Sequence, residues 1–481
     1  MSDTIESGTT AAVHLKGANG TKSDGSSGTS LSDEYYKSRL SNMAKNRPRE
    51  GIRACLHLER TPGIISLLAG KPHTSTFPFT DLKFTFRDPS DPESELPVEL
   101  TPAELQEGLQ YGPTTGVPAL VDWLYGLQEK AHGRSKNEGW QLSVGNGSQD
   151  LIYKAVTALI NPGDVVLMEA PVYAGVIPVF SSLHCEIIEV ETDAHGIKTD
   201  SLRAIYENWP ESKPKPKVLY TIPYGSNPTG ATATLERRLE VLALAREHEF
   251  FILEGKTYNQ PGMQNDLPSS FPDDPYHFLY YGPSPRPSSY FSLDRDQPQR
   301  GWVVRFDSLS KVLSSGIRIG FVSGPETIVQ AMDDHTMTAN LQPNSLSQIL
   351  ALALLKRWGY DGFFGHTTRV AEFYRKKRDV FQEAMLRHLS DVAEWSVPEA
   401  GMFMWFRLLV DADGNADEGD SNEVIRTTAL ECGVLALPGT MFYPNGRKTA
   451  YVRASFSQLE PQDVDEALRR LRKAILDSRQ S

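Results

Sequence analysis

Short apolar runs alternate with amphipathic stretches through the middle of the chain. Helical spacing of Leu, Ile and Val predicts helices that begin near Val117, Gln149 and Thr234. Buried strands are predicted at residues 165–168, 185–190, 218–222, 250–253, 302–306 and 319–322. This alternation is typical of an α/β domain with a mostly parallel sheet flanked by helices, in which ligands collect at the carboxyl ends of the strands.

The pattern changes after Pro325. From there the chain is predicted to be mainly helical to about Leu389. Two strands follow at 402–408 and 451–456, and a closing helix begins at Pro461. These elements predict a second, smaller lobe.

The N-terminal part carries weaker signals. Residues 1–33 are rich in Gly, Ser, Thr and Asp, so they predict a disordered tail. Residues 34–43 predict a short helix, and 63–72 predict a short strand that ends in a turn.

Composition excludes several classes of protein. The 481 residues carry 49 basic and 61 acidic side chains, a formal charge of −12, so general affinity for nucleic acid or an anionic membrane is not expected. No apolar run is long enough to span a bilayer, and Met1-Ser2-Asp3 does not begin a signal peptide. The three cysteines are far apart and no Cys/His cluster has ligand spacing. We therefore expect a cytoplasmic protein without a metal site.

One segment offers the chemistry to hold a phosphorylated aldehyde. It reads Ser-x-Ser-Lys-x6-Arg-x-Gly and contains Ser308, Ser310, Lys311, Arg318 and Gly320, directly after a predicted buried strand. A lysine amine can form an imine with an aldehyde, while hydroxyls and a guanidinium can hold a phosphate dianion. By itself, Lys311 is also compatible with a solvated loop.

Other turns follow predicted strands in the same way. The sequence Gly145-Asn146-Gly147-Ser148-Gln149 leads from a strand into a helix, where free N–H groups and the helix dipole favour an anion. Tyr173 follows one strand, and the turn Asn227-Pro228-Thr229-Gly230 follows another. The carboxyl ends of neighbouring strands are therefore expected to share one site.

Taken together, these motifs resemble the kynurenine/2-aminoadipate aminotransferases and the fungal aromatic aminotransferases, which are pyridoxal 5'-phosphate (PLP) enzymes of fold type I. The resemblance runs from about Arg47 to the end of the chain. It implies a large PLP domain, a smaller α+β domain built from both chain ends, and a homodimer with active sites at its interface. The implied division is 34–104 for the N-terminal part of the small domain, 105–345 for the large domain and 346–481 for the rest of the small domain.

The resemblance also implies roles for individual residues. Lys311 would carry the imine and later move a proton, Tyr173 would stack on the pyridine ring, and Asn227 would bond its phenolic oxygen. Arg453 would clamp the substrate carboxylate, as suits a forked guanidinium in an apolar strand. The cofactor phosphate would be held by Gly147, Ser148, Gln149, Ser308, Ser310, Arg318 and, from the partner subunit, Tyr111. The resemblance also places Asn227, Arg53 and Gly70 among the residues that contact the substrate.

The carboxylate that keeps the pyridine nitrogen protonated is displaced in this sequence. Related enzymes have Glu-Asp-Asp-Pro-Tyr after the strand that matches 250–253, but here Glu254 is followed by Gly255. Removing residues 255–272 restores the pattern and assigns the carboxylate to Asp273 and its neighbouring tyrosine to Tyr276.

The origin of the inserted segment, residues 255–272, has two explanations. Its ends can be encoded as GGTAAG and CCAGAC, which contain splice-site sequences, so a retained intron is one hypothesis. A genuine surface loop is the alternative, because loop closure costs only about 0.6 kcal/mol more for each doubling of length.

We therefore expect an aminotransferase that moves an amino group from an aromatic amino acid, kynurenine or 2-aminoadipate to a 2-oxo acid such as 2-oxoglutarate. Its partners would be these small molecules. A β-lyase or decarboxylase of the same fold, and a form inactivated by residues 255–272, stay open. A PLP-domain transcription regulator is disfavoured, because the N-terminal tail is too short, polar and uncharged to bind DNA.

Overall fold

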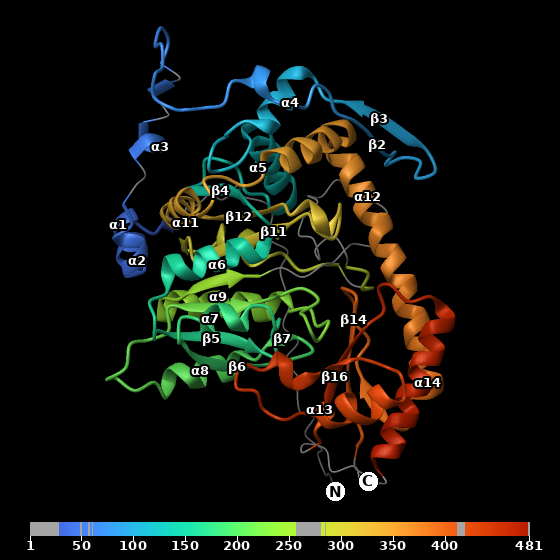
Figure 1. Cartoon of the computed structure of the whole chain (residues 1–481). Coiled ribbons are helices and arrows are strands. Elements are labelled where there is room, and N and C mark those ends of the chain that lie inside the picture. The colour runs from blue at the N-terminus through green and yellow to red at the C-terminus, as the bar shows by residue number, and fades with distance from the viewer. Residues whose placement is uncertain are drawn as a thin grey trace, which may run out of the picture.

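The computed structural model describes residues 28–48, 51–55, 58–59, 61–255, 280–283, 285–410 and 419–479. A large domain with a central sheet and a smaller domain lie side by side, and one long helix runs from the first to the second (Figure 1). The predicted α/β architecture is confirmed.

The central sheet has eight strands in the order β4-β12-β11-β9-β8-β5-β6-β7. Neighbouring strands from β11 to β6 are parallel, whereas β12 is antiparallel to both of its neighbours and β7 is antiparallel to β6. The parallel register brings the carboxyl ends of β5, β8, β9 and β11 to one edge. Their bounds are β4 (Trp140–Gly145), β5 (Val165–Ala170), β6 (Glu186–Asp193), β7 (Gly196–Ile197), β8 (Val218–Thr221), β9 (Phe251–Glu254), β11 (Val303–Ser308) and β12 (Gly320–Pro325).

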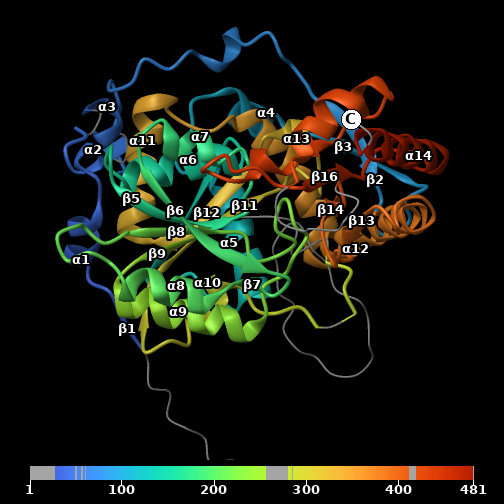
Figure 2. The same cartoon turned by 90° about the horizontal axis from the view of Figure 1, so that it is seen from below.

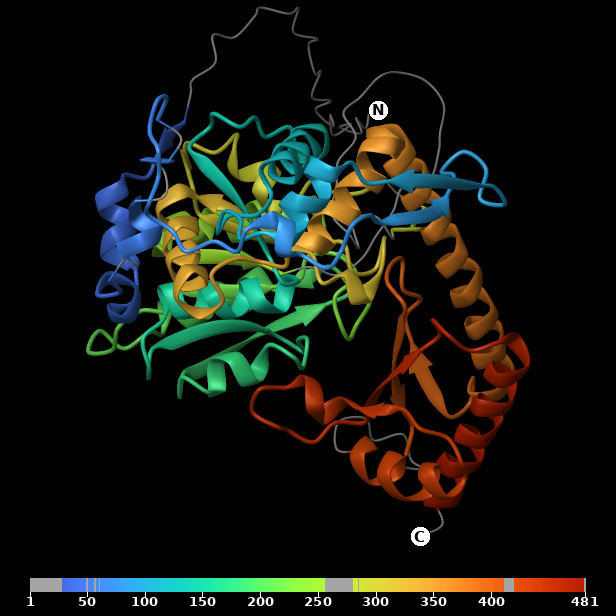
Figure 3. The ribbon, with the colours of Figure 1, turned by 45° about the horizontal axis from the view of Figure 1, so that its top comes forward.

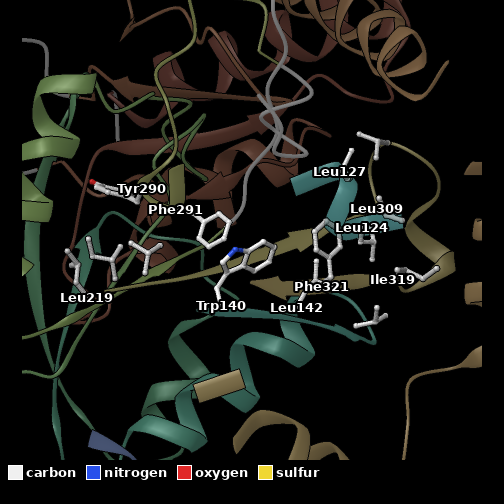
Figure 4. Close-up of a cluster of buried hydrophobic side chains, with 14 of the residues drawn as sticks. Leu124, Leu127, Trp140, Leu142, Leu219, Tyr290, Phe291, Leu309, Ile319 and Phe321 are labelled. Carbon is white, nitrogen blue, oxygen red and sulfur yellow. The ribbon is translucent and has the colours of Figure 1, made fainter. Parts of the chain in front are cut away.

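Apolar side chains cover both faces of this sheet because helices pack on each side. On β5, Leu167 enters one core whereas Val166 and Met168 enter the other, as the two-residue period of a strand requires. Figure 4 shows the first core, where Trp140, Leu142 and Phe321 meet Phe291 and Leu309. The helices of the large domain are α5 (Pro118–His132), α6 (Ser148–Leu159), α7 (Ile177–Ser181), α8 (Thr199–Glu207), α9 (Leu235–His248), α10 (Tyr290–Asp294) and α11 (Glu326–Ala339).

The small domain has its own sheet and its own core. Four antiparallel strands lie in the order β13-β14-β16-β15, and α14 covers them together with the end of α12. Figure 3 shows this group set apart from the large domain. Its elements are β13 (Ala393–Trp395), β14 (Phe403–Leu408), α13 (Ser421–Val424), β15 (Leu437–Pro438), β16 (Tyr451–Ser455) and α14 (Pro461–Ser478).

The long helix α12 (Ser345–His388) belongs to both domains. Its first part packs against α4 (Pro102–Leu109) and α5, and its later part packs against α14. The helix is interrupted at Gly359, whose φ is 63°. Side chains as far as Phe363 enter the large-domain core, and those from Ala371 enter the small-domain core. The division of the chain at 345/346 stays a prediction.

Segments near the N-terminus run along the outside of the large domain (Figure 2). Tyr36 and Leu40 pack into the large-domain core, and the hairpin β2–β3 approaches α12 through Phe86 and Trp358. The elements are β1 (Thr29–Ser30), which pairs with β10 (Gln299–Arg300), α1 (Asp33–Arg39), α2 (Asn42–Lys45), α3 (Gly51–Cys55), β2 (Lys83–Arg87) and β3 (Glu95–Glu99).

Three local predictions for this region were wrong. The disordered tail expected over 1–33 does not hold for residues 28–33, which include β1, paired with β10, and Ser32, the N-cap of α1. The helix expected over 34–43 is divided at Leu40 because Ser41 caps a second helix by accepting a hydrogen bond from the Ala44 N–H. The strand expected at 63–72 is absent, and this segment is irregular. Its apolar side chains resemble a strand in sequence, but no strand in the described part of the chain pairs with it.

Candidate active site

The Lys311 segment begins where β11 ends and is fixed by its neighbours. Leu309 and Val312 are buried in the large-domain core, so the residues between them stand at the edge of the sheet. The Leu309 N–H donates to the Ile319 carbonyl, which closes the loop. Partial burial, and then the nearby Arg318 guanidinium, lower the pKa of Lys311. A lowered pKa suits an amine that must lose its proton to react.

Arg318 joins this loop to the turn before α6. Its Nη1 donates to Ser310 Oγ over 3.2 Å, and its Nη2 donates to the Asn146 carbonyl over 3.3 Å. Gly147 has a φ of +90°, and a Cβ built on it would come within 2.2 Å of Arg318 Nη2. Only glycine therefore fits at this position.

The other predicted phosphate ligands surround the same turn. Ser308 Oγ accepts a hydrogen bond from the Ser310 N–H over 3.2 Å, and Ser148 is the first residue of α6. Gln149 Nε2 donates to the Gly175 carbonyl over 2.7 Å, which ties the turn to the loop that follows Tyr173. A helix N-terminus, hydroxyls and a guanidinium form a donor set that matches a phosphate dianion. The residues present therefore fit the phosphate of PLP.

Asp150, in the first turn of α6, holds the turn at residues 145–147 by a hydrogen bond. Asp150 Oδ2 accepts from the Asn146 N–H over 2.9 Å and from Lys154 Nζ over 2.7 Å. Lys154 is buried, so its charge is compensated mainly by this one contact. The pair fixes the backbone of Asn146, whose carbonyl also accepts from Arg318.

Asn227 and Arg453 meet across the two domains. Arg453 Nη1 donates to Asn227 Oδ1 over 2.8 Å, although the residues are 226 positions apart in the chain. The Arg453 guanidinium carbon lies 4.1 Å from the ring centre of Phe403 and 5.0 Å from that of Phe442. Two aromatic faces and one amide thus orient the forked cation.

Tyr173 lies in the loop after β5 and packs beside the second core. A Cβ built on Gly175 would come within 2.4 Å of the Tyr173 ring, so the chain passes very close to it. Within the described residues, Tyr173 and Gln149 therefore lie near the same bend at Gly175.

Two predicted residues, Gly70 and Tyr111, are not brought to this site by a single chain, and the side chain of a third, Arg53, lies outside the described structure. Gly70 is exposed, and a Cβ built on it would meet nothing within 4 Å. Tyr111 is 54% exposed and lines an open groove of about 460 Å³ together with Pro72 and Asn344. Arg53 belongs to α3, and its side chain is outside the described part of the structure.

The predicted carboxylate for the pyridine nitrogen, Asp273, and its neighbour Tyr276 lie outside the described residues. Glu254, the last residue of β9, is turned toward the core instead. Its two oxygens accept from the Tyr290 and Phe291 N–H groups over 3.1 Å, and Arg305 Nη1 is 3.1 Å away.

Little space remains beside the next residue, Gly255. A Cβ built there would come within 2.5 Å of the Tyr220 hydroxyl oxygen. Any side chain at this position requires Tyr220 to move.

Sequence reasoning did not identify Phe403 and Phe442 beside Arg453, or the buried carboxyl of Glu169 in β5. Phe403 could have been found from the two-residue period of β14, because it shares a face with Trp405, which is opposite Arg453. Glu169 could have been found as a single acidic residue near the end of an apolar strand. Phe442 ends a short 3-10 helix, Gly439–Phe442, and has no such signal.

The described residues also bear on metal binding and on membrane insertion. In the described residues, no group of three or more His, Cys, Asp or Glu side chains is arranged to hold a metal ion. None of the helices that the structure describes is both long enough and apolar enough to cross a membrane.

Comparison with known proteins agrees with the geometry. The profile of the family "Aminotransferase class I and II" matches residues 89–471. The aminotransferase tdiD of Emericella nidulans is 42% identical over 422 residues, which cover 87% of this chain and 91% of that protein. The mitochondrial kynurenine/alpha-aminoadipate aminotransferase of Bos taurus is 37% identical, with coverage of 88% and 94%.

Solved structures show the same fold. The aminotransferase Aro8 from Candida albicans superposes with a TM-score of 0.79 at 24% identity and covers 93% of this chain and 99% of its own. The kynurenine aminotransferase of Pyrococcus horikoshii, solved with pyridoxamine phosphate (PMP), has a TM-score of 0.67 at 27% identity and covers 91% and 96%. The predicted fold type, enzyme class and cofactor are thereby confirmed. This chain belongs to the class I and II aminotransferases, the PLP-dependent enzymes that transfer amino groups on fold type I.

Proposed function

We propose that this enzyme moves the amino group of an aromatic L-amino acid, kynurenine or 2-aminoadipate to a 2-oxo acid such as 2-oxoglutarate. The observation that carries the proposal is Arg453, which lies between Phe403 and Phe442 and donates to Asn227. A guanidinium in this setting suits an α-carboxylate, and the aromatic faces suit an apolar or aromatic side chain beside it. The name of the relative from Bos taurus, a kynurenine/alpha-aminoadipate aminotransferase, supports the same substrate class.

The phosphate-binding role is assigned to the turn at Gly147 together with the Lys311 loop. Support comes from the hydrogen bonds that Arg318 makes to Ser310 and to the Asn146 carbonyl. Ser148, Gln149 and Ser308 complete the donor set. In this proposal Tyr111 adds its hydroxyl from the partner subunit.

Bound PLP supplies an aldehyde that takes up the amino group and a ring that withdraws electrons from the substrate Cα. The chain's part is to hold and to move protons. Lys311 Nζ, with its lowered pKa, is proposed to take the proton from the substrate Cα and to deliver it to the cofactor carbon C4′. In the second half-reaction it is proposed to move the proton in the opposite direction. Tyr173 is proposed to cover one face of the ring, and Asn227 to donate to the phenolic oxygen.

Asp273 is proposed as the carboxylate that faces the pyridine nitrogen, with Tyr276 beside it. The inward orientation of Glu254 supports this assignment, because that carboxylate is already engaged by two backbone N–H groups and Arg305. If residues 255–272 are translated, the site depends on how that segment leaves β9.

We also propose that two copies of the chain form the active enzyme. Support comes from the apolar segment around Ile65 and Leu67, whose side chains are 92% and 98% exposed on a single chain. Gly70 and Arg53 lie in the same part of the chain and are proposed to approach the substrate from the partner subunit.

The small-molecule partners follow from the enzyme class, but the cellular location is a separate proposal. A cytoplasmic location stays a prediction, since relatives from Bos taurus and Rattus norvegicus carry names that place them in mitochondria. Fractionation of cells that express a tagged chain, with marker enzymes for each compartment, tests it.

The function is tested with purified enzyme and one amino acid at a time. When kynurenine, an aromatic amino acid or 2-aminoadipate is added without an oxo acid, we expect conversion of bound PLP to pyridoxamine phosphate. Addition of 2-oxoglutarate should then restore PLP and release glutamate, with ping-pong kinetics. Lys311→Ala should abolish both the visible absorbance of the linked cofactor and its fixation by borohydride.

Other outcomes would contradict the proposal. Pyruvate and ammonia from a β-substituted amino acid, without pyridoxamine phosphate, would indicate a lyase. Release of carbon dioxide would indicate a decarboxylase. Absence of any reaction in the full chain, but not in a chain without residues 255–272, would indicate an inactive form.

A further inference from the structure

Glu169 is a buried acidic residue that none of the roles above uses. It is the fifth residue of β5, whose side chains are otherwise apolar, and it is only 3% exposed. Burial raises its pKa to about 8, while hydrogen bonds from three groups oppose the shift. In the described structure no cation pairs with it, so only its hydrogen bonds offset the free-energy cost of burying it.

All three hydrogen bonds come from one short segment. Thr221 Oγ1 donates to Glu169 Oε2 over 2.6 Å, whereas the Ile222 N–H and Ser226 Oγ donate to Oε1 over 2.9 and 3.2 Å. These donors begin at the last residue of β8 and end directly before Asn227. One carboxylate therefore holds both ends of the 221–226 segment.

The space beside Glu169 is too small for a ligand. The cavity that it lines with Thr221 and Ser226 has a volume of about 10 Å³, which is about the minimum for one water molecule. The contacts of Glu169 thus serve the protein itself, and not a bound metabolite.

The turn after this segment is fixed from its other side as well. The Ser226 N–H donates to the Ala231 carbonyl over 2.8 Å, and the Gly230 N–H donates to the Ser226 carbonyl over 2.6 Å. Ser226 is therefore held by its side chain and by its backbone, which leaves little freedom to Asn227.

The orientation of the Asn227 amide follows from its contact with Arg453. A guanidinium only donates, so the amide atom that faces Arg453 Nη1 at 2.8 Å has to be the oxygen. Both hydrogens of Nδ2 are then directed away from Arg453. A small rotation of the turn would change the position of the amide oxygen and of the amide nitrogen together.

We propose that Glu169 is a positioning residue for Asn227. Through Thr221, Ile222 and Ser226 it holds the turn so that the amide oxygen accepts from Arg453 while the amide nitrogen donates to the phenolic oxygen of the cofactor. The second contact rests on the function proposed above for Asn227.

The experiment uses the full-length protein with three variants. Glu169→Ala removes all three hydrogen bonds, and Ser226→Ala removes one of them without leaving a large cavity. Glu169→Gln is the conservative variant, because its amide oxygen can still accept from Ile222 and Ser226. Asp333→Asn is the matched control, since Asp333 is another buried carboxyl whose contacts with Ser143 and Gln141 do not involve the turn.

The first readout is the absorbance of the lysine-linked cofactor as a function of pH. A donor to the phenolic oxygen stabilises its charge most when the neighbouring nitrogen has lost its proton, so the donor lowers the titration midpoint. Glu169→Ala and Ser226→Ala should raise the midpoint in the same direction as Asn227→Ala. The KM for the amino donor should rise about three- to tenfold through Arg453, with a smaller change in kcat.

The second readout does not need the cofactor. Hydrogen–deuterium exchange of the apoprotein should increase in peptides that cover residues 221–230 in Glu169→Ala and Ser226→Ala. Glu169→Gln should stay close to the parent in both readouts, and Asp333→Asn should leave this peptide and the midpoint unchanged.

A double variant separates the two parts of the proposal. The effect of Ser226→Ala on the midpoint should vanish when Asn227 is already alanine. An effect of equal size in that background, or unchanged exchange in residues 221–230, would overturn the role of Glu169. If exchange increases but Asn227→Ala leaves the midpoint unchanged, the proposed cofactor contact of Asn227 fails, and with it the positioning of that contact by Glu169.

Discussion

Two arginines of the site are held in different ways, and each way suits a different anion. Arg318 adopts a left-handed backbone, with φ of 53°, and is tied to Ser310 and to the Asn146 carbonyl. Arg453 is held by two aromatic rings and the Asn227 amide, which comes from the other domain. The first arrangement is closed within one domain and suits a cofactor that stays bound. The second joins two domains and suits a substrate that enters and leaves.

Replacing Arg318 should therefore weaken binding of the cofactor phosphate selectively. We expect Arg318→Ala to lower affinity for PLP about 10- to 100-fold, because a hydrogen bond to a charged group contributes about 1.5–3 kcal/mol. Affinity for unphosphorylated pyridoxal should change little. Equilibrium dialysis of both compounds measures this, with Arg469→Ala, a surface residue paired with Glu466, as the control. Equal losses for the two compounds would contradict the assignment.

Asp333 gives a prediction about pH. Burial raises its pKa from 3.8 to about 7, against the opposing effect of a hydrogen bond from Ser143. Because the folded state holds this proton more tightly than the unfolded state, stability should fall as pH rises from about 4 to about 7. The free energy of unfolding should fall by at most about 1.4 kcal/mol for each pH unit.

Asp333→Asn removes this dependence. Urea unfolding of both proteins at several pH values should show that the variant becomes more stable relative to the parent as pH rises over this interval. A difference that is constant with pH would show that Asp333 does not hold a proton in the folded protein.

At the scale of elements, the site is made from turns that follow parallel strands. The loops after β5, β8 and β11 carry Tyr173, Asn227 and Lys311, and the register of the sheet brings them to one edge. The strand β9 lies between β8 and β11, so its carboxyl end faces the middle of the site. The residue that follows β9 there is Gly255, which has no side chain to offer.

Deleting residues 255–272 should strengthen cofactor binding. The shortened chain places Asp273 directly after Glu254, and a carboxylate opposite a protonated ring nitrogen should improve affinity for PLP about 10- to 100-fold. Tyr220 has to shift to admit that side chain, since its hydroxyl lies against Gly255. Titration of the imine absorbance with PLP measures the change.

The control for this deletion is the same shortened chain with Asp273→Asn, which should lose the gain. Full imine absorbance of the undeleted chain at stoichiometric PLP would contradict the prediction. Transcript reads across the junction show independently whether cells keep the segment.

Sequence patterns predicted the sheet and the smaller lobe well because both depend on local periodicity. The strand that carries Arg453 is an example, since apolar residues alternate around it. The segment at 63–72 has a similar local pattern, but no strand among the described residues pairs with it, and a local pattern does not show whether a partner exists. The orientation of Glu254 and the pairing of Phe403 and Phe442 with Arg453 depend on contacts between distant residues. The Lys311, Asn227 and Gly147 turns could be found because their unusual residues are adjacent in the chain.

At the scale of the whole molecule, the described residues form separate cores in the large and small domains. These are joined by α12 and by a small cluster in which Ala170 packs with Trp405, Phe442 and Tyr443. Among the described residues, the apolar segment around Ile65 and Leu67 belongs to neither core. A second copy of the chain is the proposed cover for it. Such an interface would also give Tyr111 and Gly70 their place in the site.

Charges on this segment should dissociate the proposed dimer. In Ile65→Glu/Leu67→Glu, loss of two buried apolar side chains removes about 3–6 kcal/mol from association, so the dissociation constant should rise at least about a hundredfold. Light scattering after size-exclusion chromatography measures the mass. Leu435→Glu, which changes another exposed leucine in the small domain, should leave it unchanged. A parent protein with the mass of one chain would refute the dimer.

The hydrogen bond between Asn227 and Arg453 joins the large and small domains, and two domains can unfold at different denaturant concentrations. If the small domain unfolds first, the proposed phosphate-binding turn at Gly147 and Arg318 stays folded, while the proposed carboxylate contact of Arg453 is lost. Such a protein would retain its prosthetic group yet no longer capture an amino acid. Loss of substrate affinity at mild stress, ahead of any release of the coenzyme, is the behaviour that this architecture implies.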